Sequence, residues 1–168
     1  LTFGIVASKF NKFVTSRLLT ECVKALTKAG VTDEAIEVVR VPGAFEIPLV
    51  ARQLARSGRF DAVICLGAVI RGDTPHFEYI STEVSRGILQ ASMDSNIPVI
   101  FGVLTTDTVA QAIERADPEK LNRGADVAKT AIEMVNVMRL LKKEGSGEAP
   151  QPATPSRRAG RSAARPKR

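Results

Sequence analysis

Four short apolar runs alternate with segments of helical periodicity, and this alternation most constrains the fold of the chain. The runs are continuously apolar and rich in β-branched residues, so both of their faces are expected to be buried, as in a parallel sheet. They cover residues 3–7, 35–41, 61–70 and 98–104. Helices are predicted at residues 14–29, 46–57, 75–93, 108–116 and 124–143. The pattern predicts an α/β protein, a three-layer α/β/α sandwich around a four-stranded parallel sheet.

The length of 168 residues suits one hydrophobic core, and no apolar run approaches the roughly 20 residues of a membrane span. The sequence opens on a strand-like segment and not on a leader, so a cytoplasmic protein is expected. Its two cysteines, Cys22 and Cys65, form no CxxC or CxxH pattern and lie in apolar surroundings, which indicates reduced, buried thiols. A nucleophilic cysteine is the alternative, and it would need the only histidine, His76, as its base.

The net charge of +6 belongs mostly to the C-terminal end. Residues 145–168 contain six basic residues and one acidic residue, are rich in Pro and Ala, and have no periodic apolar face. We therefore predict a folded catalytic domain at residues 1–144 and a disordered basic tail at residues 145–168. A merely solvated tail is the favoured interpretation, and weak, salt-dependent contact with nucleic acid is the alternative.

Four loops follow the carboxyl ends of the predicted strands, at residues 8–13, 42–46, 71–76 and 105–107. Ligands of open parallel α/β sheets bind at this edge. All four loops carry residues that a simple connection would not require. A binding site is therefore expected where they meet.

The loop at residues 71–76 is the most informative of the four. Gly72 permits a tight turn, Asp73 or Thr74 is placed to cap the next helix, and Pro75 suits its first turn. Free amides at a helix start favour an anion such as phosphate, and His76 could transfer protons to a bound substrate. The alternative is a well-capped helix with an incidental surface histidine.

Other candidate residues have weaker signals. Phe10, beside Asn11, could stack on a flat heterocycle, or it could simply anchor its loop on the core. Glu46 could accept hydrogen bonds from sugar-like hydroxyls, although an acidic residue is also favoured in the first turn of a helix. Arg115 could bind phosphate bidentately, or it could be an ordinary charge at a helix end.

Several motifs are missing from the sequence. It contains no P-loop and no GxGxxG, and a single histidine without paired cysteines cannot build a zinc site. We therefore expect no metal and no cofactor. The remaining possibility is acid–base chemistry on a phosphorylated substrate, with an aromatic surface for a planar ring.

Six motifs occur in the order, and at nearly the spacing, found in one enzyme family: FGIVASKFN, VRVPGAFEIP, GAVIRGDTPHFEYI, PVIFGVLTTDT, AIERA and NRGADVAKTAIEM. On these motifs the chain resembles the lumazine synthases over residues 1–143. The resemblance implies a flavodoxin-like fold and a cofactor-independent transferase of riboflavin biosynthesis. Such an enzyme condenses 5-amino-6-(D-ribitylamino)uracil with 3,4-dihydroxy-2-butanone 4-phosphate, releasing phosphate and water, and its product implies a functional link to riboflavin synthase.

The resemblance also implies roles for individual residues. His76 would be the proton donor. The ribitylaminouracil would be bound by Phe10, Ala44, Phe45, Glu46, Ala68, Val69, Ile70 and Phe101. The butanone phosphate would be bound by Asp73, Thr74 and Arg115. Supporting roles would belong to Asn11, Arg123 and Asp126.

Members of the family form pentamers, so the resemblance implies a homopentamer in which a neighbouring subunit supplies Phe101 and Arg115. Whether pentamers close into an icosahedral shell is left open. Arg123 stands where the family commonly has lysine, and the two cations are not equivalent. Two alternatives are a relative whose specificity has moved to purine or pterin compounds, and a non-catalytic flavin or lumazine binder.

Overall fold

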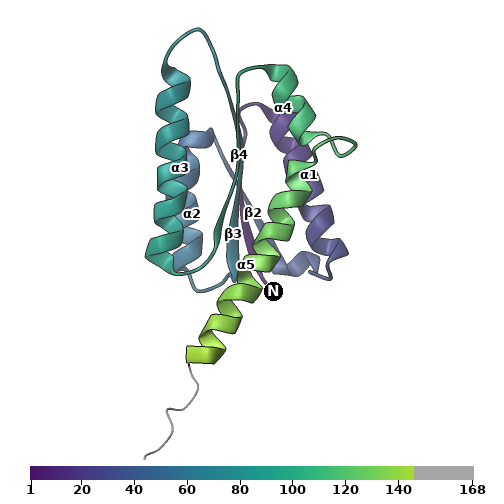
Figure 1. The fold of residues 1–168 in the computed structure, drawn as a ribbon, viewed down its shortest axis with the longest axis vertical. Coiled ribbons are helices and arrows are strands. Elements are labelled where there is room, and N and C mark those ends of the chain that lie inside the picture. The colour runs from purple at the N-terminus through teal and green to yellow at the C-terminus, as the bar shows by residue number, and fades with distance from the viewer. Residues whose placement is uncertain (146–168) are drawn as a thin grey trace, which may run out of the picture.

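The computed structural model describes residues 1–145 and contains four strands and five α-helices in this range (Figure 1). The strands are β1 (Phe3–Ser8), β2 (Ile36–Val41), β3 (Ala62–Ile70) and β4 (Val99–Thr106). The helices are α1 (Lys12–Lys28), α2 (Ile47–Arg56), α3 (His76–Ser95), α4 (Val109–Ala116) and α5 (Arg123–Gly145), and single 3-10 turns occupy Asp33–Ala35 and Ala44–Glu46. Every predicted helix and strand is present, with its ends within two residues of the predicted ones.

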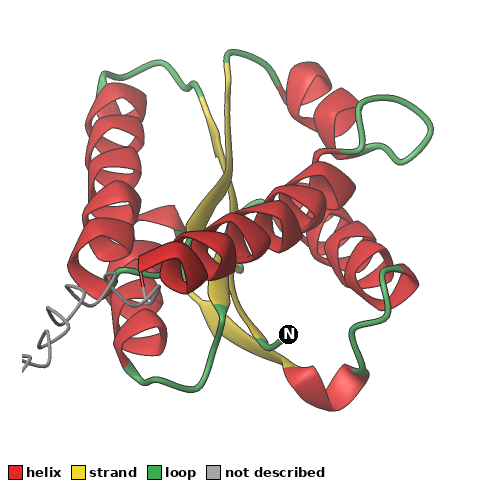
Figure 2. Cartoon of the chain, turned by 60° about the horizontal axis from the view of Figure 1, so that its bottom comes forward, coloured by secondary structure: helices red, strands yellow, loops and turns green. Residues whose placement is uncertain are grey.

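The strands form one parallel sheet in the order β2-β1-β3-β4. Helices α1, α4 and α5 cover one face, and α2 and α3 cover the other (Figures 1 and 2). Because successive side chains of a strand point to opposite faces, Ile64 and Leu66 enter the first core, whereas Val63 and Cys65 enter the second. The predicted three-layer α/β/α, flavodoxin-like sandwich is confirmed.

Both cysteines are free and completely buried. Burial raises the pKa of the Cys22 thiol to about 12, and it also raises the pKa of Cys65. Because the thiolate is the reactive form, neither side chain offers a nucleophile at neutral pH. The prediction of reduced, buried thiols is confirmed.

The predicted disordered tail and its contact with nucleic acid concern residues that lie almost entirely outside the described part of the chain. Helix α5 continues to Gly145, two residues beyond its predicted end. None of the helices within residues 1–145 has the length and apolar content needed to cross a membrane.

The carboxyl edge of the sheet is uneven. Strand β1 ends at Ser8, and its last pairing with β3 joins Ala7 to Leu66. Strand β3 continues along β4 as far as the pairing of Ile70 with Thr106. Residues 68–70 therefore extend beyond the end of β1, and we call them the β3 overhang.

Candidate active site

A cavity of about 430 Å³ lies over the β3 overhang, between the loops that follow β1, β2 and β3. Ten of the fifteen site residues expected from the sequence line it: Phe10, Asn11, Ala44, Phe45, Glu46, Ala68, Val69, Ile70, Thr74 and His76. These residues come from segments that are far apart in the sequence. Three of the four loops expected to meet at this sheet edge contribute to the cavity, and the fourth, at residues 105–107, does not line it.

Asn11 fixes the floor of the cavity. Its side-chain Nδ2 donates a hydrogen bond of 2.9 Å to the carbonyl of Ala68 in the overhang. Its own carbonyl accepts from the amides of Val14 and Thr15, which starts helix α1. The backbone of Asn11 is left-handed, with φ of 58°, a conformation that asparagine tolerates better than most residues. Asn11 therefore holds both the strand and the helix beside the cavity.

Two aromatic rings at the cavity are largely free of protein contact. The exposed fraction is 71% for Phe10 and 56% for Phe45. The loop of Phe10 is held by its backbone, because its amide donates to the carbonyl of Pro42 over 3.0 Å. Phe10 is thus not the core-packed anchor of the alternative interpretation. Both rings offer faces on which a planar ligand could stack.

Glu46 forms the end of the 3-10 turn that precedes α2. Its Oε2 accepts a hydrogen bond of 3.0 Å from the amide of Gly43, so one carboxylate oxygen stabilises the turn. The other oxygen, Oε1, has no hydrogen-bond partner among the described residues. A ligand with hydroxyl groups could donate to that oxygen.

Helix α3 begins at His76 with Pro75 as its N-cap residue, and no side chain caps it. The prediction that Asp73 or Thr74 caps this helix is therefore wrong. A capping side chain must come from the residue immediately before the first helical residue, and Pro75 occupies that position. The first-turn amides of His76 and Phe77, beside the cavity, have no hydrogen-bond partner among the described residues and would suit an anion.

Four lining residues were absent from the predicted site: Gly43, Gly72, Phe77 and Ile80. Gly72 was expected only to permit a tight turn. Ile80 follows His76 by four residues, so both side chains lie on one face of α3. That helical spacing was the available signal for Ile80.

Five predicted site residues do not line the cavity: Asp73, Phe101, Arg115, Arg123 and Asp126. Phe101 lies on the edge strand β4 and is 44% exposed. The Arg115 guanidinium donates to the carbonyl of Gln111 within α4, over 3.2 Å. Arg123 and Asp126 pair with each other in the first turn of α5, at 3.3 Å. The cavity wall of one chain thus contains neither lysine nor arginine among the described residues.

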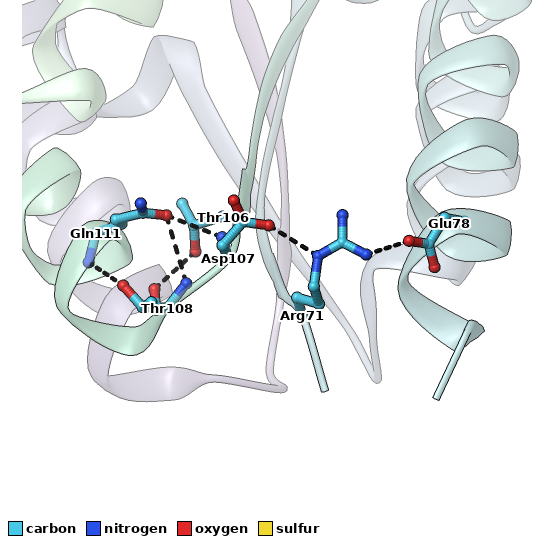
Figure 3. Close-up of polar contacts among 6 residues, drawn as sticks. All are labelled: Arg71, Glu78, Thr106, Asp107, Thr108 and Gln111. Atoms are coloured by element: carbon cyan, nitrogen blue, oxygen red, sulfur yellow. Dashed lines mark hydrogen bonds and ion pairs between the residues drawn. The ribbon is translucent and has the colours of Figure 1, made fainter. Parts of the chain in front are cut away.

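An ion-pair cluster lies beside the cavity (Figure 3). Arg71 bridges Glu78 of α3 and Asp107 after β4, and its guanidinium lies 4.3 Å from the ring centre of Phe77. The hydrogen bonds that Arg71 donates to Asp107 and Glu78 raise the pKa of Arg71, and the bond from Arg71 lowers the pKa of Glu78. We refer to Arg71, Phe77, Glu78 and Asp107 as the Arg71 cluster.

Comparison with known proteins gives two agreeing results. Residues 1–139 match the family model of 6,7-dimethyl-8-ribityllumazine synthase. A protein of Syntrophus aciditrophicus (strain SB), named 6,7-dimethyl-8-ribityllumazine synthase, is 61% identical over 139 residues. The aligned region covers 83% of this chain and 90% of that relative.

Proposed function

This chain belongs to the 6,7-dimethyl-8-ribityllumazine synthase family, and we propose that the cavity over the β3 overhang is its active site. The chain is a transferase of riboflavin biosynthesis. It condenses 5-amino-6-(D-ribitylamino)uracil with 3,4-dihydroxy-2-butanone 4-phosphate and releases phosphate and water. The observation that carries the assignment is the family match over residues 1–139. A cytoplasmic location and supply of the product to riboflavin synthase are further parts of the proposal.

The ribitylaminouracil would lie along the overhang. The exposed ring of Phe10 would stack on its pyrimidine, while the backbone of residues 68–70 would meet the polar edge of that ring. Glu46 would accept hydrogen bonds from the ribityl hydroxyls through Oε1, because Oε2 holds Gly43. Ala44 and Phe45 would contact the same substrate from the adjoining loop.

The butanone phosphate would lie at the start of α3. The uncapped first turn and the Thr74 hydroxyl offer donors to a phosphate, with Asp73 in the loop before them. Since the cavity wall includes no lysine or arginine within residues 1–145, a cation from elsewhere would balance the phosphate charge. Arg115 of a neighbouring subunit would supply it, and Phe101 of that subunit would close the pyrimidine pocket.

His76 would move the protons that the reaction requires. The substrate amine attacks the ketone to give an imine, phosphate leaves, an enol forms and the second ring closes. A histidine can donate or accept a proton in such steps near neutral pH. General acid–base catalysis contributes typically about 10²–10⁴-fold, and holding the two substrates together contributes the rest.

The shared site requires an oligomer, and we propose a homopentamer. Several large apolar side chains of the described chain are more than a third exposed, among them Phe101 on β4 and Val109 and Ile113 on α4. Exposed apolar surface of this kind is expected at subunit interfaces. The proposal extends to the pentamer and leaves a larger icosahedral shell open, while Arg123 and Asp126 keep supporting roles.

The first test is turnover by the purified chain supplied with both substrates. Lumazine formation is followed by absorbance and fluorescence against the spontaneous background. Phe10→Ala should weaken binding of the ribitylaminouracil, whereas Phe13→Ala, an equally simple loss of an exposed ring outside the cavity, should not. Product formation no faster than background, from a well-folded oligomer, would contradict the proposal.

A second test asks whether the site is shared between subunits. His76→Ala and Arg115→Ala are each expected to be nearly inactive as uniform oligomers. Subunits of the two variants, dissociated and reassembled together, should regain activity, because some interfaces then combine an intact His76 with an intact Arg115. Absence of recovery in verified mixed oligomers would place both residues in a single-chain site.

A further inference from the structure

Arg71 is fixed to the sheet by its backbone and reaches two elements with its side chain. Its amide donates to the carbonyl of Thr106 over 2.8 Å, one step beyond the last pairing of β3 with β4. Its Nε donates to Asp107 over 2.8 Å, and its Nη1 donates to Glu78. Figure 3 shows the guanidinium between the two carboxylates, one on α3 and the other in the loop between β4 and α4. One side chain thus spans the carboxyl edge of the sheet.

The Arg71 cluster reaches the cavity through a single residue, Phe77. Arg71 itself does not line the cavity, but Phe77, on which it stacks, does. Phe77 lies between His76 and Glu78 in the first turn of α3. Arg71 therefore grips the same helical turn that presents His76 to the cavity.

Besides the packing of Phe77 on the core and the bond from the Glu78 amide to the Pro75 carbonyl, that turn has few other polar attachments among the described residues. No side chain caps α3, and neither Asp73 nor Thr74 donates or accepts a side-chain hydrogen bond within the described chain. Asp107, in the loop between β4 and α4, is better fixed, because its amide donates to the side chain of Gln111 over 2.9 Å. The capped start of α4 thus holds Asp107 in place, Asp107 holds Arg71, and Arg71 stabilises the uncapped start of α3.

We propose that Arg71 is a positioning residue, which sets the orientation of His76 and Phe77 through its contacts with Phe77, Glu78 and Asp107. The inference rests on the proposed function, because it concerns the geometry of that active site. An arginine is required because its planar guanidinium can donate to both carboxylates, Glu78 and Asp107, while one of its faces stacks on the ring of Phe77. A lysine can satisfy one carboxylate at a time.

The experiment compares Arg71→Met and Arg71→Lys with the wild type. Small misplacements of a reacting group lower rates strongly, so Arg71→Met should lower kcat about 10- to 100-fold with little change in either KM. Arg71→Lys should recover part of this loss. Glu78→Gln and Asp107→Asn should each lose less than Arg71→Met.

The chain offers a matched control at the opposite end of the sheet. Arg59 pairs with Glu37 and lies 4.7 Å from the ring centre of Phe60, with an exposure similar to that of Arg71. Arg59→Met removes the same kinds of contact far from the cavity, and it should leave kcat unchanged. An equal loss of kcat in Arg59→Met would overturn the proposal.

Amide hydrogen exchange of residues 72–78 provides a readout that needs no turnover. Arg71→Met should exchange about tenfold faster in this segment, and Arg59→Met should match the wild type there. A wild type without activity would refute the proposed function and leave this exchange test standing. Unchanged exchange and kcat in Arg71→Met would overturn the positioning role. A raised KM for the butanone phosphate with unchanged kcat would also overturn it, because Arg71 would then bind substrate directly.

Discussion

Helices α3 and α4 both start at the carboxyl edge of the sheet, yet their first turns are built differently (Figure 3). In α4, Thr108 accepts a hydrogen bond from the amide of Gln111 over 3.1 Å. The side chain of Gln111 in turn accepts from the amides of Asp107 and Thr108. In α3, Pro75 stands at the cap position, and among the described residues no side chain before the helix caps it.

This difference suggests that the start of α4 serves the stability of the fold, whereas the start of α3 serves ligand binding. The capping box of α4 satisfies donors that would otherwise be unpaired, so this turn contributes to folding and has little left to offer a ligand. The start of α3 leaves the amides of His76 and Phe77 unpaired among the described residues, beside the cavity, and the Arg71 cluster supports it. Changes in the first turn of α3 should therefore alter activity, and changes in the capping box of α4 should alter stability.

The largest expected effect is that of His76→Ala. The variant should lose about 10²–10⁴-fold in kcat, because general acid–base help is removed while substrate binding remains. Its melting temperature should stay near that of the wild type, since His76 makes no side-chain hydrogen bond within the described chain. Steady-state kinetics beside thermal unfolding check both statements. Wild-type kcat in this variant would remove His76 from the mechanism.

Thr74→Ala should have the next largest effect. Loss of one hydrogen bond to a charged phosphate should raise the KM for the butanone phosphate about tenfold. The KM for the ribitylaminouracil should change much less, and so should stability. Separate titration of each substrate distinguishes the two constants, and an equal rise in both would contradict a phosphate-specific role for Thr74.

Thr108→Ala tests the other half of the comparison. Loss of this cap should lower the free energy of unfolding by about 1 kcal/mol, measured by denaturant titration. Activity per folded molecule should be unchanged, and Thr108→Ser should retain most of the stability. A fall in kcat without a fall in stability would contradict the structural role assigned to the start of α4.

The smallest effect is a pH dependence from Glu78. The bond from Arg71 lowers the pKa of Glu78 below its ordinary value of 4.5. A depressed carboxylate pKa contributes stability that is present above 4.5 and is lost as the pH falls through the lowered pKa. The melting temperature of the wild type should therefore exceed that of Glu78→Gln slightly at neutral pH, and the difference should vanish in acid. A difference that grows as the pH falls would show the opposite linkage.

Sequence reasoning located the helices and strands well because the signals are physical and local. Continuous apolar runs can only be buried strands or helices, and Gly and Pro mark where they stop. The same reasoning placed Phe10, Glu46 and His76 at one edge, since parallel strands bring their carboxyl ends together. The cavity that they line was predictable to that extent.

The remaining features depend on geometry that spacing does not contain. The cap of α3 was mispredicted because a shift of one residue changes which side chain meets the first amides. The Arg71 cluster joins Arg71 to Asp107, 36 residues later, through the conformation of one long side chain. By contrast, the distance of Phe101 and Arg115 from the cavity of their own chain agrees with the resemblance, which assigned both residues to the site of a neighbouring subunit.

The number of residues in the β3 overhang sets the length of the cavity floor. A strand rises about 3.3 Å per residue, so the three residues beyond β1 form a floor about 10 Å long. Substitutions can change what this floor recognises, but they cannot change how long it is. Only an insertion or deletion that alters β1 relative to β3 can do that, and each such step shifts the floor by one whole residue.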